Sequence, residues 1–364
     1  MNICLIGENL SSLALAKNLV NKKIKVFFYY HKNKKFYDKN RTIGISKSNL
    51  DFFNKEIIKI KENKVWKINE IDIYSEKFKK NKILNFKKKN EELFSIIKNY
   101  QIYESLEKNL KKNKLFKRVL IKNNNFYKKI LKEDKYQLII NCDENNLISK
   151  NFFYKKVFKD YNSNAYATII KHKKCQNRKA VQIFTKKGPI AFLPISKLET
   201  SIVFSKINEP FFLNEDEIKK LLNKYSNYEI KSFSKLEKFN LNLSFSRNFY
   251  YKNIMLFGGA LYRVHPLAGQ GFNMIIRDIK ILSKIIQDRL DLGLALDHLI
   301  YKEFEKKTKS YNFIFVNGID FIHNFFQFDN SYKNNFINQI LEISGKNKIL
   351  NKYISRYADT GMPI

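Results

Sequence analysis

The first 30 residues constrain the fold more than any other part of the sequence. Residues 2–6, NICLI, form a short apolar run that predicts a buried strand, and Gly7 interrupts it. Apolar residues then recur at helical spacing over 10–20, where Asn9 or Ser11 can cap the helix, and IKVFFYY at 24–30 predicts a second strand. Together these segments form a βαβ unit. Such a unit binds anions at the helix N-terminus, because free N–H groups and the helix dipole point outward there.

Three later segments predict further structure. Short apolar and polar runs alternate over 165–206, which is typical of an antiparallel sheet. KNIMLFGG at 252–259 predicts a strand that ends in two glycines, and the apolar residues of 271–290 lie on one face of a long helix. The chain after 298 is largely helical in pattern and rich in aromatic residues. We therefore expect an α/β protein that also contains an antiparallel sheet.

Composition excludes several classes of protein. The 364 residues are 44% hydrophobic, so the chain is long and apolar enough for two packed domains and is not intrinsically disordered. The three cysteines are far apart, which predicts neither a disulfide framework nor a metal cluster and favours a reducing compartment. The sequence has no run of 18 apolar residues, so we expect no transmembrane helix. The N-terminus lacks a basic region and a small-residue cleavage site, so we expect no signal peptide. Motifs of serine hydrolases, zinc enzymes and P-loop proteins do not occur.

The charge balance has two readings. Lys and Arg number 69 against 34 acidic residues, a net charge of +35, but only eight of the basic residues are Arg. Lys occurs here with abundant Asn, Ile, Phe and Tyr, which indicates compositional drift in an AT-rich genome. The other reading is attraction to an anionic surface, either membrane lipid or nucleic acid. Nucleic-acid binding rests on charge alone and lacks the usual arginines, so we do not expect it.

Glycine placement is the best local indication of a site. Gly258, Gly259, Gly269 and Gly271 fall within fourteen residues, although the whole chain has only 11 glycines. Glycine at such positions allows positive φ or the close approach of a ligand. GQG opens the helix over 271–290, and exposed amides at its start can hold an anionic or carbonyl-rich ligand. The alternative is a tight strand-to-helix turn without a ligand.

The same segment carries a family resemblance. GGALYRVHPLAGQGFNMIIRD at 258–278 resembles the GDAAHxxHPxAGQGxNxGxxD segment of FAD-dependent aromatic-ring monooxygenases of the p-hydroxybenzoate hydroxylase fold. It is most similar to the ubiquinone-biosynthesis hydroxylases among them. Three more segments resemble that branch in family order: NRTIGISKSNLDFF at 40–53, QIFTKKGPIAFLPI at 182–195 and SRYADTGM at 355–362.

The resemblance implies a Rossmann-like FAD-binding domain of the GR2 type with an inserted antiparallel substrate domain and C-terminal helices. The expected division is an FAD-binding domain of 1–72, 96–160 and 248–300, a substrate domain of 73–95 and 161–247, and a C-terminal helical segment of 301–364.

The resemblance also implies the site residues. The family's first turn is GxGxxG and cradles the FAD pyrophosphate, whereas only the first of its glycines is kept here, and Tyr29 and Tyr30 stand where an acidic residue normally binds the ribose. The Asp that binds the ribityl chain in the family is absent here, and the family's ADGxxS signature is only partly kept. The expected cofactor-binding residues are Gly7, Asn9, Ser12, Arg41, Asp143, Gly258, Gly259, Gly271, Phe272 and Asn273. The residues expected to hold the reacting ring and stabilise its intermediate are Pro266, Gly269 and Gln270. No metal ligand is expected, His265 is expected to shape the loop, and Asp278 to serve the fold.

The implied activity is FAD-dependent hydroxylation of the aromatic ring of a polyprenyl phenol in ubiquinone biosynthesis, through a flavin C4a-hydroperoxide formed with O₂. NAD(P)H or an electron-transfer protein would reduce the flavin. Because a prenylated substrate is very apolar, the resemblance implies a cytoplasmic protein in peripheral contact with the inner face of the membrane or with a quinone-biosynthesis complex. The alternative is a flavin-free or weakly flavin-binding relative that acts as a scaffold in such a complex.

Overall fold

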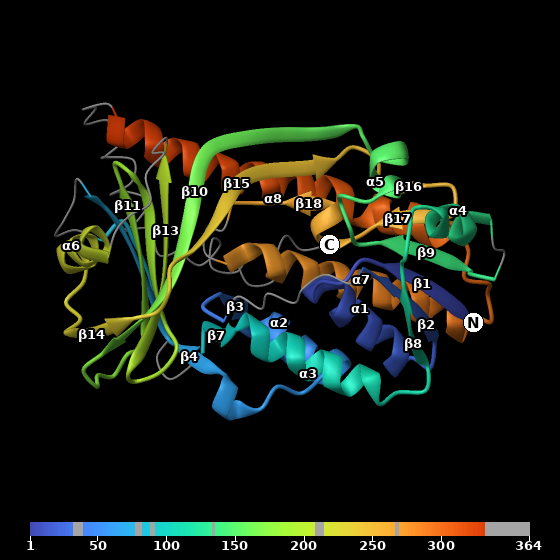
Figure 1. Ribbon diagram of the computed structural model, residues 1–364, viewed down its shortest axis with the longest axis horizontal. Helices are drawn as coiled ribbons and strands as arrows, with labels where there is room; N and C mark the ends of the chain where they lie inside the picture. Colours follow the sequence, from blue (N-terminus) through green and yellow to red (C-terminus); the bar gives the residue numbers. More distant parts are fainter. Residues whose placement is uncertain are drawn as a thin grey trace.

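Two large sheets stand at opposite ends of the molecule, with helices between and along them (Figure 1). The computed structural model describes residues 1–31, 39–76, 82–87, 92–132, 135–207, 215–265 and 269–331. The motif at 355–362 lies outside these residues. The longest described helix, α8 (Leu299–Ser331), extends from the end with the six-stranded sheet to the end with the nine-stranded sheet (Figure 1). Helix α7 (Gln270–Asp291) begins between the two sheets.

The six-stranded sheet is built on the predicted βαβ unit. Its strands, in order, are β16 (Tyr250–Tyr251), β17 (Ile254–Leu256), β9 (Leu138–Asn141), β1 (Asn2–Ile6), β2 (Lys25–Tyr30) and β8 (Phe116–Leu120). All neighbours are parallel except β16 and β17. Helix α1 (Leu10–Asn21) connects β1 to β2. Ile3, Leu5 and Ile6 are fully buried, as expected where helices cover both faces of a parallel sheet.

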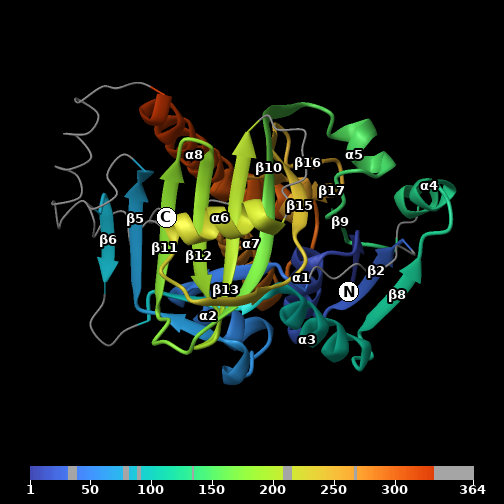
Figure 2. The same cartoon turned by 60° about the vertical axis from the view of Figure 1, so that its left-hand side comes forward.

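The nine-stranded sheet contains the alternating segments. Its main path is β18 (Tyr262–Arg263), β15 (Glu237–Ser246), β10 (Lys156–His172), β13 (Glu199–Ile207), β12 (Gly188–Pro194), β11 (Lys179–Thr185), β5 (Glu70–Ser75) and β6 (Leu84–Lys87), while β14 (Ile230–Phe233) pairs with β10. Its neighbours are antiparallel except β5 and β11. Helix α6 (Glu215–Tyr225) covers one face, where Ile218 and Leu222 pack with Phe192 and Phe204 (Figure 2).

A three-stranded sheet of β3 (Thr42–Ser46), β7 (Phe94–Lys98) and β4 (Trp66–Ile68) completes the strands. The shorter helical elements are α2 (Lys47–Phe52), a π-helix (Phe53–Ile57), a 3₁₀ turn (Glu62–Lys64), α3 (Asn99–Lys111), α4 (Asn125–Lys132), α5 (Leu147–Phe152) and η4, a 3₁₀ turn (Gly258–Ala260). Of the helices in the described ranges, none is long and apolar enough to cross a membrane.

The mixed α/β class with parallel and antiparallel sheets is confirmed. The division into domains stays a prediction. The nine-stranded sheet takes in β5 from Glu70 and β10 from Lys156, so both strands cross boundaries that were placed at 72 and 160. Strand β10 is 17 residues long and begins near the six-stranded sheet, so it links the two halves continuously (Figure 1).

Candidate functional site

Three turns meet at the carboxyl edge of the parallel sheet. Gly7 follows β1, Asp143 follows β9 and Gly258 follows β17. Gly7 has φ of 99°, and a Cβ on it would lie 2.8 Å from the Cβ of Asp143. Gly258 has φ of 61°, and a Cβ on it would lie 2.7 Å from the Cβ of Ser11. Only glycine allows these turns to approach so closely. Open α/β sheets bind ligands at this edge.

The start of α1 is closed by its own side chains. Asn9 is the N-cap: its Oδ1 accepts the Ser12 N–H at 3.0 Å, and the Ser12 Oγ accepts the Asn9 N–H at 3.0 Å. The Asn9 Nδ2 also donates to the Cys142 carbonyl at 2.8 Å, which ties the turn to β9. The two residues form a capping box, so the structure confirms Asn9 as the cap. Two of the N–H groups at this helix start are therefore bonded within the protein.

An arginine covers the end of β2 beside this turn. The Arg118 Nη2 donates to Glu8 at 2.6 Å, and its Nη1 donates to Glu107 at 2.9 Å. Its Cζ lies 4.0 Å from the centre of the Tyr30 ring. Sequence reasoning did not find Arg118, because no local motif marks it. Only the pairing of β8 with β2 places it next to the first turn.

The second glycine region is more open. A Cβ on Gly259 would meet no described atom within 4 Å. Gly269, with φ of 63°, begins α7 without a side-chain cap from the described residues. The side-chain oxygen of Gln270 is buried and accepts no hydrogen bond from the part of the chain that the structure describes. A buried acceptor of this kind is expected to have a donor beyond the described residues.

Asn273 fixes this region to β3. Its Oδ1 accepts the Ser46 N–H at 2.9 Å and the Asn49 Nδ2 at 3.1 Å. Its Nδ2 donates to the carbonyls of Gly44 at 2.9 Å and Gly269 at 3.2 Å. Asn273 is fully buried, so this side chain uses its polar atoms within the protein. Its expected contact with the cofactor stays a prediction.

A buried carboxyl group holds the same region from the other side. The Tyr262 hydroxyl donates to Asp278 at 2.6 Å, and the Asn312 Nδ2 lies 3.1 Å from the second carboxyl oxygen. Burial raises the pKa of Asp278 to about 6, although both hydrogen bonds and the charge of Arg277 oppose this rise. Asp278 therefore fastens β18, α7 and α8 together.

A pocket faces this region from the nine-stranded sheet. It is partly open to solvent and is lined by Ala165, Gln182, Pro189, Ala191, Val203, Phe204, Ser205 and the buried ring of His265. Cross-strand partners supply this lining, because Ala191 pairs with both Gln182 and Val203. Of these residues, only His265 was expected near the site from the sequence; Gln182, Pro189 and Ala191 lie in the segment 182–195, which carried the resemblance without a role for any of them. The period-two alternation of each strand is the signal that could have found them.

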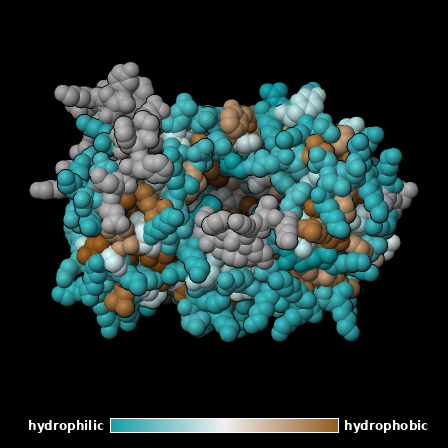
Figure 3. Space-filling model, in the orientation of Figure 1, coloured by the Kyte–Doolittle hydropathy of each residue, from teal (hydrophilic) through white to brown (hydrophobic). Residues whose placement is uncertain are grey.

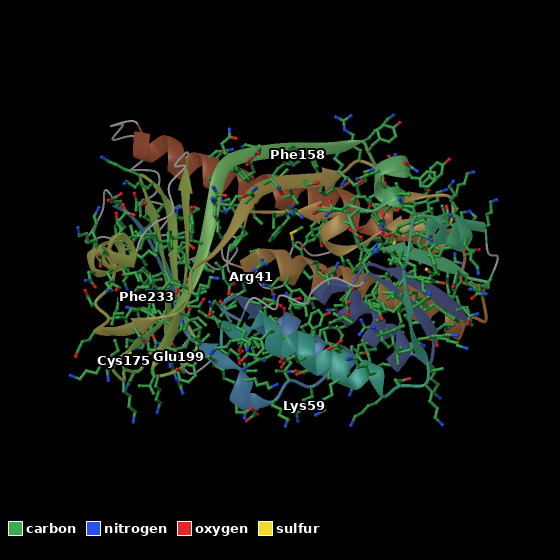
Figure 4. All side chains as sticks on the ribbon, in the orientation of Figure 1. Arg41, Lys59, Phe158, Cys175, Glu199 and Phe233 are labelled. Atoms are coloured by element: carbon green, nitrogen blue, oxygen red, sulfur yellow. The ribbon has the colours of Figure 1, made fainter. Side chains whose placement is uncertain are left out.

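The region between the two sheets is hollowed on the face drawn in Figure 3, and apolar side chains show inside the hollow. Arg41 lies between the sheets in Figure 4 and stacks at 4.9 Å on the Phe239 ring of β15. His265 packs edge-on to Tyr161, with ring centres 5.3 Å apart. Arg263 forms an ion pair with Glu144, which follows Asp143.

The expected site residues thus gather in two groups. The first comprises Gly7, Asn9, Ser12, Asp143 and Gly258, at the carboxyl edge of the parallel sheet. The second comprises Gly269, Gln270, Gly271, Phe272 and Asn273, at the start of α7, where Phe272 packs near Phe53 at 6.2 Å between ring centres. Gly259 lies between them and Arg41 beside the second. Pro266 lies outside the described residues. Their roles toward a cofactor stay predictions.

Solved structures identify the architecture. The p-nitrophenol 4-monooxygenase PnpA of Pseudomonas putida matches with a TM-score of 0.76 at 10% identity, over 100% of this chain and 98% of that chain. HpxO of Klebsiella pneumoniae, solved with FAD and uric acid, matches with a TM-score of 0.70 at 10% identity, over 99% of this chain and 96% of that chain. The chain has the fold of the FAD-dependent aromatic monooxygenases.

Sequence comparison confirms the expected resemblance within this fold. The ubiquinone biosynthesis monooxygenase COQ6 of Caenorhabditis elegans is 22% identical over 47% of this chain and 48% of its own length. The 3-demethoxyubiquinol 3-hydroxylase of Escherichia coli is 26% identical over 39% of this chain and 38% of its own length. The chain spans about half or less of the length of the curated relatives that it matches. No family model matches the sequence.

The cofactor of this fold fits the two groups of residues unequally. The open space at Gly259 and, in the second group, the Gln270 side-chain oxygen, which has no donor among the described residues, suit the hydrogen-bonding edge of an isoalloxazine. The first group keeps the glycine turn, but Asn9 and Ser12 bond each other where the fold normally receives a pyrophosphate. The residues therefore fit the flavin ring better than the dinucleotide.

Proposed function

We propose that this protein is an FAD-dependent monooxygenase that hydroxylates the aromatic ring of a prenylated phenol in ubiquinone biosynthesis. The observation that carries the proposal is the open space at Gly259 and the start of α7 at Gly269, which no described side chain caps, together with the pocket on the nine-stranded sheet that His265 helps to line. The relatives whose names specify ubiquinone hydroxylation support the choice of substrate.

When bound and reduced, the flavin supplies the activation of O₂. The protein's own part is to bind, orient and exclude water. The amides around Gly269 and the Gln270 side chain would hold the isoalloxazine edge, and Ala165, Ala191 and Val203 would line the ring of the substrate with apolar surface. A dry, shaped site of this kind prevents loss of a reactive oxygen species to water. The reductant and the route of oxygen activation stay predictions.

Contact with a membrane or a quinone-biosynthesis complex also belongs to the proposal. A prenylated phenol partitions into lipid, so the enzyme must meet its substrate at a membrane surface or receive it from a partner. The net charge of +35 favours an anionic bilayer over a neutral one.

The proposal is tested by loading and turnover. The purified protein is mixed with excess FAD, freed of unbound cofactor and examined for a visible flavin band. The loaded protein then receives a reductant, O₂ and a polyprenyl phenol, and we expect a product heavier by one oxygen atom. Ala191→Phe fills the pocket and should abolish the product while the flavin band remains. Ala295→Phe, at an exposed position in the loop after α7 that does not line the pocket, is the matched control and should leave turnover intact.

The scaffold alternative is favoured by one observation, the closed start of α1. A folded protein that takes up no flavin at all would contradict the hydroxylase and support the scaffold.

A further inference from the structure

The first turn and the glycine region differ in what they leave available to a ligand. We propose that this chain binds flavin through the isoalloxazine half alone, so that riboflavin and FMN bind about as tightly as FAD. This inference rests on the proposed function, because it concerns the cofactor of the same site.

The phosphate position is the first step. In dinucleotide-binding βαβ units, glycine at the second motif position lets the pyrophosphate approach the amides of the helix start. Asn9 occupies that position here, and its side chain accepts the Ser12 N–H in the way a phosphate oxygen would. The Asn9 N–H is bonded to the Ser12 Oγ, and Ser12 is fully buried. A pyrophosphate would have to displace a cap that the helix already has.

The charges around the turn are the second step. Glu8 lies inside the turn and Asp143 packs directly against Gly7. The cation among them, Arg118, is shared between Glu8 and Glu107. A pyrophosphate carries negative charge, so it would be repelled by these carboxylates unless it first separated Glu8 from Arg118. Because Arg118 is already paired with Glu8, its charge is not available to attract a pyrophosphate.

The adenosine position is the third step. The fold normally uses an acidic residue at the end of the second strand to bind the ribose. Tyr30 ends β2 here, and the Arg118 guanidinium lies over its ring at 4.0 Å. The ribose acceptor is replaced, and one face of the ring that could stack on adenine is already covered. At Gly259, by contrast, a Cβ would meet no described atom within 4 Å, so the backbone there can be approached by a ligand.

Affinity measurements test the inference. Dissociation constants for FAD, FMN and riboflavin are measured in one buffer by quenching of flavin fluorescence, with ADP as a competitor. We expect the three constants to agree within about tenfold, since an adenosine diphosphate half that makes no net contact adds no affinity. ADP should not displace riboflavin or FMN.

Three outcomes separate the inference from the proposed function. FAD that binds about a hundredfold tighter than riboflavin, or flavin that ADP displaces, overturns the inference and leaves the hydroxylase in place. Failure of every flavin to bind overturns both.

A double variant tests the cause. Glu8→Gln with Asn9→Gly frees Arg118 from one carboxylate and opens the helix start, and glycine is itself a tolerated N-cap. We expect FAD affinity to rise about tenfold or more, since charge-assisted hydrogen bonds to phosphate become available, while riboflavin affinity stays unchanged. Asn113→Gly, at the opposite edge of the same sheet, is the control and should change neither constant. An equal rise for riboflavin and FAD, or no rise at all, contradicts the proposed cause.

Discussion

The two glycine-containing turns of this protein both precede a helix, but they satisfy their backbone in different ways. At the first turn, the side chains of Asn9 and Ser12 bond the N–H groups at the start of α1. At the second, α7 begins at Gly269, and the described residues supply no side-chain cap. The second turn is instead held through two buried side chains of α7: Asn273 bonds to Ser46 of β3, and Asp278 bonds to Tyr262 and Asn312.

This difference shows that a motif's glycines do not by themselves make a ligand site. A helix start is available to a ligand when its donors are not already satisfied. When side chains of the following helix fix a turn, the backbone N–H groups of the turn remain available to a ligand. When an N-cap fixes it, the cap bonds the same N–H groups that a ligand would need. The following predictions test the outer supports and the turn itself.

The largest effect is expected at Asn273. Asn273→Leu would remove four hydrogen bonds, three of them buried, to β3, α2 and the N-cap of α7, so we expect a loss of about 3–5 kcal/mol in the free energy of unfolding. Urea denaturation followed by circular dichroism measures it. Asn317→Leu, on the exposed face of α8, removes one hydrogen bond to its own helix and should change stability by less than about 1 kcal/mol. Equal losses in the two variants would mean that Asn273 does not support the second turn.

The next effect depends on pH. The pKa of Asp278 is about 6 in the folded protein, above its ordinary value of 3.8, because the carboxyl group is buried. Between these values the folded state retains a proton that the unfolded chain has released, so the contribution of Asp278 is fully present below pH 3.8 and is lost as pH rises through 6. The loss amounts to about 3 kcal/mol.

Asp278→Asn isolates this contribution. We expect the difference in unfolding free energy between wild type and variant to shift in favour of the variant as pH rises from 4 to 7. Subtracting the two proteins removes the other titrating carboxyls, such as Glu76, whose pKa is lowered to about 2 by the hydrogen bonds from Lys224 and Tyr225 despite its burial. A difference that does not change with pH would show that Asp278 is not a buried titrating group.

The smallest effect compares two adjacent glycines. Gly258→Ala places a Cβ 2.7 Å from Ser11 at a φ of 61°, and we expect a loss of about 1–3 kcal/mol. Gly259→Ala meets open space and should change stability by about 0.5 kcal/mol or less. Adding Ser11→Gly should restore part of the loss at Gly258, since the contact disappears while the strained φ remains. Thermal unfolding distinguishes these variants, and similar values at both glycines would contradict the close contact with α1.

Much of the fold could be read from local patterns. The apolar run at 2–6, the glycine that interrupts it and the helical spacing after it are features of consecutive residues, and they form β1, the turn and α1 as expected. The same holds for the alternating segments that form β10 to β13. The resemblance at 258–278 pointed to the region that the structure leaves open at Gly259.

The site was harder to predict where it depends on residues far apart in the chain. Arg118 meets Glu8 across 110 positions, and Asn273 meets Ser46 across 227. Gln182 and Val203 reach one pocket because both strands pair with β12. The alternation within each strand shows which residues share a face but not which strands are neighbours, so the sequence did not bring the pocket residues together and Arg118 was missed. The expected contact of Asn273 with a cofactor stays a prediction.

The sequence alone determined the strand and helix types of these segments and limited the cap of α1 to Asn9 or Ser11, because side-chain alternation, helical spacing and capping depend on backbone within one or two turns. Tertiary structure alone decided which turn stays open. That outcome follows from strand order, which brings Arg118 to the first turn and β3 to the second, and from burial, which makes each of those polar contacts strong enough to hold its turn in place.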